Sequence, residues 1–327
     1  MRTRPAGGPP DSGPLDSGPA AGGAAAGGPP APAASEHYAD VASYRLEPGR
    51  AAPGRPAPGA VLMLHGLGGD RGQLWPYAGG DQARTRLAPD LRAHGATMLV
   101  GDPGDFTFAG LTADLTALLD RLQFPPAVVV GMSMGAGVAV ALALREPARV
   151  RGLVLIRPAW LDTTPPPNLL PLIHVGSLLR RYGTQAGLAR FTQSSEFGRV
   201  RHRSAAAAGS LTAQFSAPHA VPRAVRLTHL PCSAPFRRIG ELRQVQVPSL
   251  VIGARADPQH PFEMARIWAS ELPGSRLLEA PRRDTDPAGY HSCLTEASIG
   301  FSAALDREPG QAQRNGLLNY FPLTVYC

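Results

Sequence analysis

Three residues whose side chains could together perform nucleophilic catalysis are spread along the chain: Ser133, Asp257 and His291. A serine hydroxyl is a weak nucleophile at neutral pH, so it needs a base within hydrogen-bond reach and a third group that orients the base. Histidine and aspartate are suited to these two tasks. The trio therefore predicts that Ser133 attacks a carbonyl carbon, that His291 carries the proton and that Asp257 orients the imidazole.

The surroundings of Ser133 indicate a sharp turn between a strand and a helix. A β-branched run precedes the G-M-S-M-G motif, in which Gly131 and Gly135 flank the serine, and a helix-compatible run, 136–144, follows it. Glycines are needed there because a nucleophile at the tip of a strained turn leaves no room for neighbouring Cβ atoms. The simpler alternative is a small residue in a tight turn, but the strand and helix on either side favour a nucleophile.

The stretch 127–144 carries no charged side chain and approaches the length of a membrane span. Its glycines, its serine and the change of periodicity in its middle favour a buried parallel strand that leads into a buried helix. We therefore expect no integral membrane span here.

A predicted buried strand, 60–64, leads directly into H-G-L-G-G at 65–69. Glycines immediately after a central strand allow backbone N–H groups to face a ligand, which is how an oxyanion hole is built in such a sheet. We expect the amides of Leu67 and Met134, the latter directly after the nucleophile, to be the two oxyanion donors.

The rest of the chain alternates between predicted strands and helices. The expected strands lie at 150–156, 247–253 and 276–279, and the expected helices at 73–86, 111–122 and 262–271. This alternation predicts an α/β fold with a parallel sheet covered by helices on both faces. Asp257 follows one of these strands, so it would reach into the crevice at the carboxyl ends of the strands.

Three motifs occur in a characteristic order: H-G-L-G-G at 65–69, A-P-D-L-R-A-H-G at 88–95 and G-M-S-M-G at 131–135. Their order and spacing resemble those of the motifs in serine hydrolases of the α/β-hydrolase fold, particularly bacterial esterases and lipases. The resemblance implies a mostly parallel, doubly wound sheet with an inserted helical cap. It also implies cleavage of an ester-type bond of a small molecule through an acyl-enzyme on Ser133, without a cofactor or metal. Acyl transfer, thioester cleavage and non-catalytic ligand binding stay open as alternatives.

The resemblance also bears on rival candidates for the catalytic roles. The D-P-Q-H-P motif that begins at Asp257 is similar to the acid loop of the family, although some relatives place the acid where Asp162 lies. We expect His260 to be structural, because it lies only three residues beyond Asp257 and could not easily reach from acid to serine. A nucleophilic Cys293 is disfavoured, because it would share a helix start with its base, His291.

Composition divides the chain into segments. We expect a disordered Gly/Pro/Ala-rich tail over 1–35, a core formed by 36–160 and 241–305, a helical cap over 161–240, and a C-terminal tail, 306–327, of unknown role.

Proline and glycine interrupt every candidate signal-peptide window, which favours a cytoplasmic protein. The three cysteines include no C-x-x-C pair, so neither a disulfide framework nor a zinc site is indicated. The chain has no lysine, which excludes Schiff-base chemistry and a Walker-type phosphate loop.

Positive charge is concentrated in one segment. Residues 163–240 contain ten arginines and a single acid, Glu196, for a net +9, whereas the whole chain carries +7 and the remainder therefore −2. One interpretation is that arginine is simply the only basic residue that this chain uses. The other is that the cap attracts an anionic substrate or partner, such as a carboxylate-bearing ester, a coenzyme-A or carrier-bound thioester, or an acidic membrane surface. Nucleic-acid binding is disfavoured, because R-V-R-H-R at 199–203 has no interleaved aromatic residues.

Overall fold

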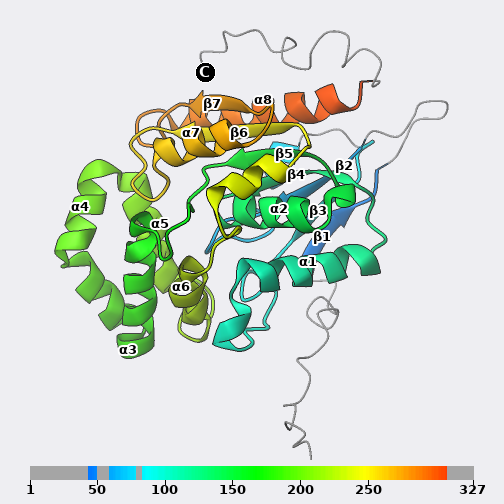
Figure 1. The fold of residues 1–327 in the computed structure, drawn as a ribbon. Coiled ribbons are helices and arrows are strands. Elements are labelled where there is room, and N and C mark those ends of the chain that lie inside the picture. Colours follow the sequence, from blue (N-terminus) through cyan, green and yellow to red (C-terminus); the bar gives the residue numbers. More distant parts are fainter. Residues whose placement is uncertain (1–42, 50–58, 79–82, 308–327) are drawn as a thin grey trace, which may run out of the picture. The chain divides into compact units, whose positions relative to one another are not determined.

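A computed structural model describes residues 43–49, 59–78 and 83–307, all of which belong to one compact unit. The predicted tail 1–35 and residues 308–327 lie outside the described residues. The centre of the fold is a seven-stranded sheet in the order β1-β3-β2-β4-β5-β6-β7, in which only the edge strand β1 is antiparallel to its neighbour (Figure 1). The strands are β1 Tyr44–Glu47, β2 Ala60–Leu64, β3 Arg86–Pro89, β4 Ala127–Met132, β5 Val150–Ile156, β6 Ser249–Ala254 and β7 Arg276–Ala280.

The central strands are apolar because both faces of the sheet are covered by helices. Residues of β2 alternate between two hydrophobic clusters: Leu62 and Leu64 pack with the helices on one face, and Val61 and Met63 pack with the other cluster. The first cluster includes side chains of α1 Phe108–Arg121, α2 Met134–Arg145 and α7 Phe262–Glu271, and the second those of α8 Pro287–Leu305. The predicted doubly wound α/β fold is thereby confirmed.

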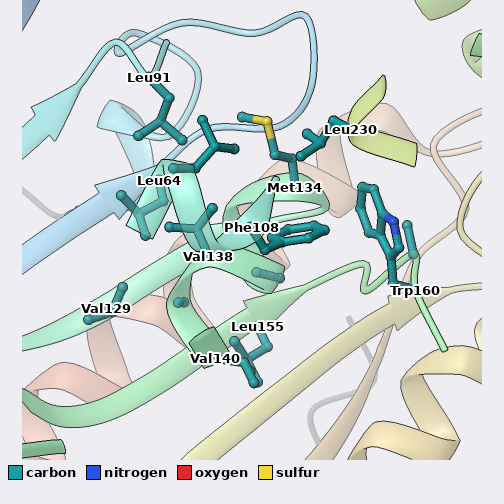
Figure 2. Close-up of a cluster of buried hydrophobic side chains, with 14 of the residues drawn as sticks. Leu64, Leu91, Phe108, Val129, Met134, Val138, Val140, Leu155, Trp160 and Leu230 are labelled. Atoms are coloured by element: carbon teal, nitrogen blue, oxygen red, sulfur yellow. The ribbon is translucent and has the colours of Figure 1, made fainter. Parts of the chain in front are cut away.

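The first cluster lies directly beneath the turn at Ser133. Figure 2 shows Leu64, Met134 and Val138 together with Phe108 and Trp160. The Phe108 and Trp160 rings meet edge to face, with centroids 4.9 Å apart. Such close packing fixes the end of β4 and the start of α2, and this makes the turn between them rigid.

The apolar stretch 127–144 divides at Ser133 into β4 and α2, as predicted. Within the described residues, no helix combines the length and the apolar character that a membrane span requires. The expected helix over 73–86 was wrong: this region contains the short 3-10 helix η3, Trp75–Ala78, and then β3 from Arg86. The expected helix and β3 share only Arg86, which pairs with both β1 and β2.

A helical insertion separates β5 from β6. It contains α3 Leu170–Thr192, α4 Ser195–Arg203, α5 Ala205–Ser216 and α6 Val225–His229, with short 3-10 segments between them. The helix α3 is broken at Gly183, which has φ +73°. The insertion occupies the segment for which the sequence predicts a cap.

Two arginines of the insertion hold it on the loop that follows β3. Arg223 Nη2 donates to the carbonyl of Gly95 at 3.0 Å, and Arg226 Nη1 donates to the carbonyl of Ala93 at 2.5 Å. Both arginines are buried. Two of the ten arginines in the segment 163–240 therefore stabilise the fold. The others remain as candidates for surface charges.

Candidate active site

The turn at Ser133 has the strained geometry that its flanking glycines predict. Ser133 has φ +53°, in the left-handed region, and lies between the last residue of β4 and the first of α2. A Cβ on Gly135 would lie 1.9 Å from the carbonyl oxygen of Leu64, and one on Gly131 would lie 2.3 Å from the carbonyl oxygen of Gly135. The backbones approach too closely for any other residue, and the serine hydroxyl is held at the tip of the turn.

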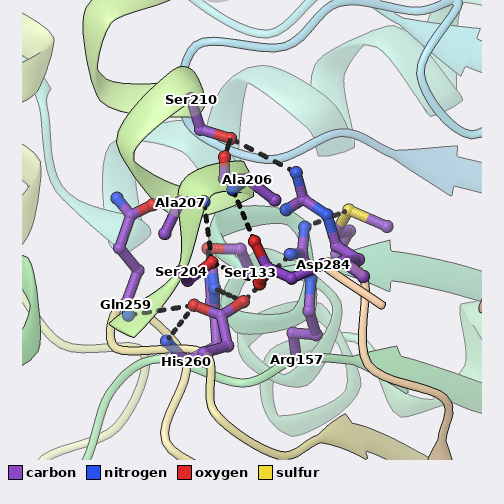
Figure 3. A network of polar contacts seen from close by, with 12 residues as sticks. Ser133, Arg157, Ser204, Ala206, Ala207, Ser210, Gln259, His260 and Asp284 are labelled. Atoms are coloured by element: carbon purple, nitrogen blue, oxygen red, sulfur yellow. Dashed lines mark hydrogen bonds and ion pairs between the residues drawn. The ribbon is translucent and has the colours of Figure 1, made fainter. Parts of the chain in front are cut away.

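A histidine and an aspartate complete a hydrogen-bonded chain with this serine. Nε2 of His260 lies 2.9 Å from Oγ of Ser133, and Nδ1 of the same ring lies 2.9 Å from Oδ2 of Asp257 (Figure 3). A neutral imidazole satisfies both contacts when Nδ1–H donates to the carboxylate and Nε2 accepts from the hydroxyl. This is the arrangement in which a serine, a general base and an orienting acid cooperate.

The histidine in this series of hydrogen bonds is His260 and not His291, which corrects the sequence prediction. His291 lies exposed near the start of α8, where its Nδ1 is 2.5 Å from the hydroxyl of Tyr77. The structure brings Ser133 and Asp257 together but does not bring His291 to either.

The expectation that His260 could not reach the serine was wrong because the loop folds back on itself. The backbone amides of Gln259 and His260 donate to Oδ1 of Asp257 at 3.0 and 3.2 Å. This tight turn places the imidazole between the carboxylate and Ser133. The signal in the sequence was the spacing of aspartate and histidine, three residues apart directly after a buried strand.

The rival residues lie elsewhere. Asp162 is exposed, and its carboxylate accepts a hydrogen bond from the amide of Ile239 at 2.5 Å. Cys293 is buried in the second hydrophobic cluster, among side chains of α8. Neither position supports the alternative role that was considered for it.

Arg157 is a cation beside the acid that the sequence patterns did not indicate. It follows β5, its guanidinium is buried, and Nη1 donates to Oδ2 of Asp257 at 3.1 Å. A second nitrogen, Nη2, donates to Sδ of Met132 at 3.2 Å, at the end of β4. Nothing in the sequence marks this arginine except its place at the carboxyl end of a buried strand.

Burial and these charges set the protonation of the site. Burial alone would raise the pKa of Asp257, but the charge and hydrogen bond of His260, together with Arg157, hold it well below its ordinary value. Burial lowers the pKa of His260, the carboxylate of Asp257 partly offsets this, and Arg157 lowers it further. At neutral pH the site therefore holds a carboxylate and a neutral imidazole, the form that accepts a proton from serine.

The loop 65–69 lies against the nucleophile. A Cβ on Gly66 would be 3.6 Å from Cβ of Ser133. Nε2 of His65 accepts from the amide of Leu91 at 3.0 Å, and Nε2 of His94 accepts from the amide of Gly68 at 3.1 Å. Burial lowers the pKa of both histidines, so the rings stay neutral and hold the loop.

The predicted oxyanion donors belong to this loop and to the adjacent helix start. Met134 is the first residue of α2, where a backbone N–H has no acceptor within the helix. Leu67 lies in the loop between Gly66 and Gly68. Their role as donors stays a prediction.

The motif A-P-D-L-R-A-H-G is structural. The carboxylate of Asp90 accepts from the amides of Arg71 and Ala96 at 2.6 and 2.9 Å. Arg92 forms a two-pronged pair with Asp114 of α1, both contacts being 2.9 Å long. Within the described ranges, no group of three or more His, Cys, Asp and Glu side chains is arranged to hold a metal ion.

A mostly parallel sheet with a serine at the turn after β4 and an acid after β6 defines the class of α/β hydrolases. Residues 59–282, more than half of the chain, match the family described as the α/β hydrolase fold, and the chain belongs to this family. The match ends before His291.

Three similar proteins illustrate the family. A Variovorax paradoxus protein with the provisional name carbamate hydrolase RutD is 28% identical over 263 residues, which cover 76% of this chain and 90% of that protein. The enol-lactonase from Burkholderia xenovorans LB400 has a TM-score of 0.61 at 22% identity, over 80% of this chain and 95% of its own. A thermophilic esterase from Thermogutta terrifontis has a TM-score of 0.59 at 21% identity, over 80% and 93%. These two solved structures support the fold alone.

Proposed function

We propose that this protein is a serine hydrolase that cleaves an ester-type bond of a small molecule, with Ser133 as nucleophile, His260 as general base and Asp257 as the orienting acid. The observation that carries the proposal is the pair of 2.9 Å contacts that links hydroxyl, imidazole and carboxylate in a buried site. A serine at a strained turn without a neighbouring base would not support a role as nucleophile.

The reaction follows from the positions of these groups. Ser133 Oγ attacks the carbonyl carbon as its proton passes to Nε2 of His260, and the amides of Leu67 and Met134 stabilise the oxyanion. The imidazolium, stabilised by Asp257, then protonates the leaving alcohol, and the acyl group stays on Ser133. A water molecule, deprotonated by the same imidazole, attacks the acyl-enzyme. The imidazolium then returns the proton to Ser133 Oγ as the acid is released.

One comparison supports a carbonyl substrate. The name of the Variovorax paradoxus relative refers to a carbamate, which is attacked at a carbonyl carbon. Acyl transfer to another acceptor would use the same acyl-enzyme. A non-catalytic binding protein of this fold is the other alternative, and the paired serine, histidine and aspartate weigh against it.

A fluorophosphonate probe tests the proposal, because it reacts only with an activated serine. We expect the wild type to be labelled and Ser133→Ala to remain unlabelled. A folded wild type that resists labelling would favour the binding protein. A series of p-nitrophenyl esters of increasing acyl length then measures hydrolysis directly, and an added alcohol acceptor shows whether the acyl group is transferred.

A further inference from the structure

The glycine-rich loop, 65–69, must hold the amide of Leu67 in a fixed direction if this amide is to stabilise an oxyanion. The amides of Gly66, Gly68 and Gly69 each donate to a protein acceptor, at 2.7, 3.1 and 2.9 Å. In the described part of the chain, the amide of Leu67 has no acceptor. The loop therefore uses its other amides to fix its own conformation and leaves this one for a ligand.

A side chain of the helical insertion packs on this loop. Gln214 of α5 is buried, with 6% of its surface exposed. A Cβ on Gly68 would lie 2.2 Å from Nε2 and 2.5 Å from Oε1 of Gln214, so the amide head of the glutamine covers this glycine. Gly68 directly follows Leu67, and a shift of Gly68 would move the backbone of Leu67 with it.

The amide head of Gln214 is held from two sides. Its Nε2 donates to the carbonyl of Ser210, one helical turn earlier, at 3.3 Å, and its Oε1 accepts from Nη2 of Arg226 at 3.4 Å. The same guanidinium donates through Nη1 to the carbonyl of Ala93 at 2.5 Å. The next residue, His94, is the one whose ring supports the glycine-rich loop. Arg226 thus connects Gln214 to the segment that fixes the other side of that loop.

The helix that carries Gln214 is itself fixed to the core. Ser204 Oγ and the amide of Ala206 donate to the carboxylate of Asp284 at 2.7 and 2.8 Å (Figure 3). Asp284 lies between β7 and α8, so the start of α5 is held on a core segment. The position of Gln214 over the loop is therefore set by the fold.

We infer that Gln214 is a positioning residue for the reaction: its packing on Gly68 holds the glycine-rich loop in the conformation in which the amide of Leu67 faces the oxyanion. The inference rests on the proposed function and adds that the helical insertion completes the oxyanion hole. Gln214 acts through Gly68 and not through contact with the substrate.

The test compares three variants in one helix. Gln214→Ala removes the contact with Gly68, whereas Gln214→Met keeps a side chain of similar length there. Phe215→Leu is the matched control, because the ring of Phe215 packs on Phe191 of α3, with centroids 5.8 Å apart. Each variant is assayed with p-nitrophenyl butyrate and with a trifluoromethyl ketone, which adds to Ser133 and forms an oxyanion. Thermal unfolding confirms that all proteins are folded.

Acylation and deacylation both pass through an oxyanion, so kcat and kcat/KM should fall together. Loss of a whole oxyanion donor lowers kcat by about a hundredfold to a thousandfold, and a displaced donor should cost less. We expect about a tenfold loss of kcat in Gln214→Ala, with KM within about twofold. The affinity for the ketone should fall by a similar factor, because the ketone adduct resembles the transition state. Gln214→Met and Phe215→Leu should stay within about threefold of the wild type.

Three results would overturn the inference: an unchanged kcat and ketone affinity in Gln214→Ala, a loss of the same size in Phe215→Leu, or a Gln214→Met as impaired as Gln214→Ala. The proposed function fails separately, if the wild type does not hydrolyse the ester and Ser133 is not labelled by the fluorophosphonate.

Discussion

Replacement of Arg157 by glutamine should change the pH dependence of hydrolysis. Oδ2 of Asp257 accepts from both His260 Nδ1 and Arg157 Nη1, so these nitrogens are at most about 6 Å apart. At that distance two unit positive charges repel by about 3 kcal/mol at an effective dielectric constant of about 20, and by less than about 1 kcal/mol in water. Loss of the guanidinium therefore makes protonation of His260 easier and raises its pKa.

The sign of the effect follows from the role of the base. Only the neutral imidazole accepts the proton of Ser133, so a raised pKa moves the acidic limb of kcat/KM to higher pH. An energy of about 1.4 kcal/mol, within the range given above, corresponds to an approximately tenfold lower rate on the acidic limb. The rate at alkaline pH should change less.

The assay measures kcat/KM with a neutral ester over about pH 4 to 9, where histidine titrates. Arg157→Lys is the matched control, because it keeps the positive charge and should keep the limb near its wild-type position. A rate that falls equally at every pH, with an unmoved acidic limb, would refute the electrostatic role and leave Arg157 a purely structural one.

Two further predictions concern stability. Gly135→Ala places a Cβ against the carbonyl of Leu64 and should cost at least about 3 kcal/mol, whereas Gly209→Ala, which meets open space on α5, should be neutral or stabilising by up to about 1 kcal/mol. Urea unfolding of the two variants measures the difference, and similar values would contradict the close approach at the turn. Asp114→Ala removes the two-pronged partner of buried Arg92, which keeps a contact of 3.1 Å to Asp105, and should cost about 1.5 to 3 kcal/mol. A change below about 1 kcal/mol in the same experiment would show that this pair contributes little.

The sequence predicted the fold well where local patterns dominate. The bounds of β5 and α7 agree with those expected, because β-branched runs and helical periodicity are strong there. Local patterns failed over 73–86, where a helix was expected. The described residues of that stretch contain the short helix η3 and, at Arg86, the first residue of β3.

The candidate site was predicted in part. Ser133 and Asp257 were found because each lies directly after a buried strand, and strand order brings those ends together. His260 was rejected because a residue only three positions beyond Asp257 was not expected to reach from the acid to the serine. Two amide bonds to Asp257 fold the loop so that its ring does reach both. Arg157 could not be found, because its role depends on a contact between residues a hundred positions apart.

The choice between the two histidines is the most direct test of the proposed catalytic base. His260→Gln and His291→Gln are compared in hydrolysis of p-nitrophenyl butyrate and in fluorophosphonate labelling of Ser133. We expect His260→Gln to lower kcat/KM by at least about a thousandfold and to abolish rapid labelling, and His291→Gln to stay within about threefold of the wild type. Near-wild-type activity of a folded His260→Gln, with the large loss in His291→Gln, would contradict the assignment.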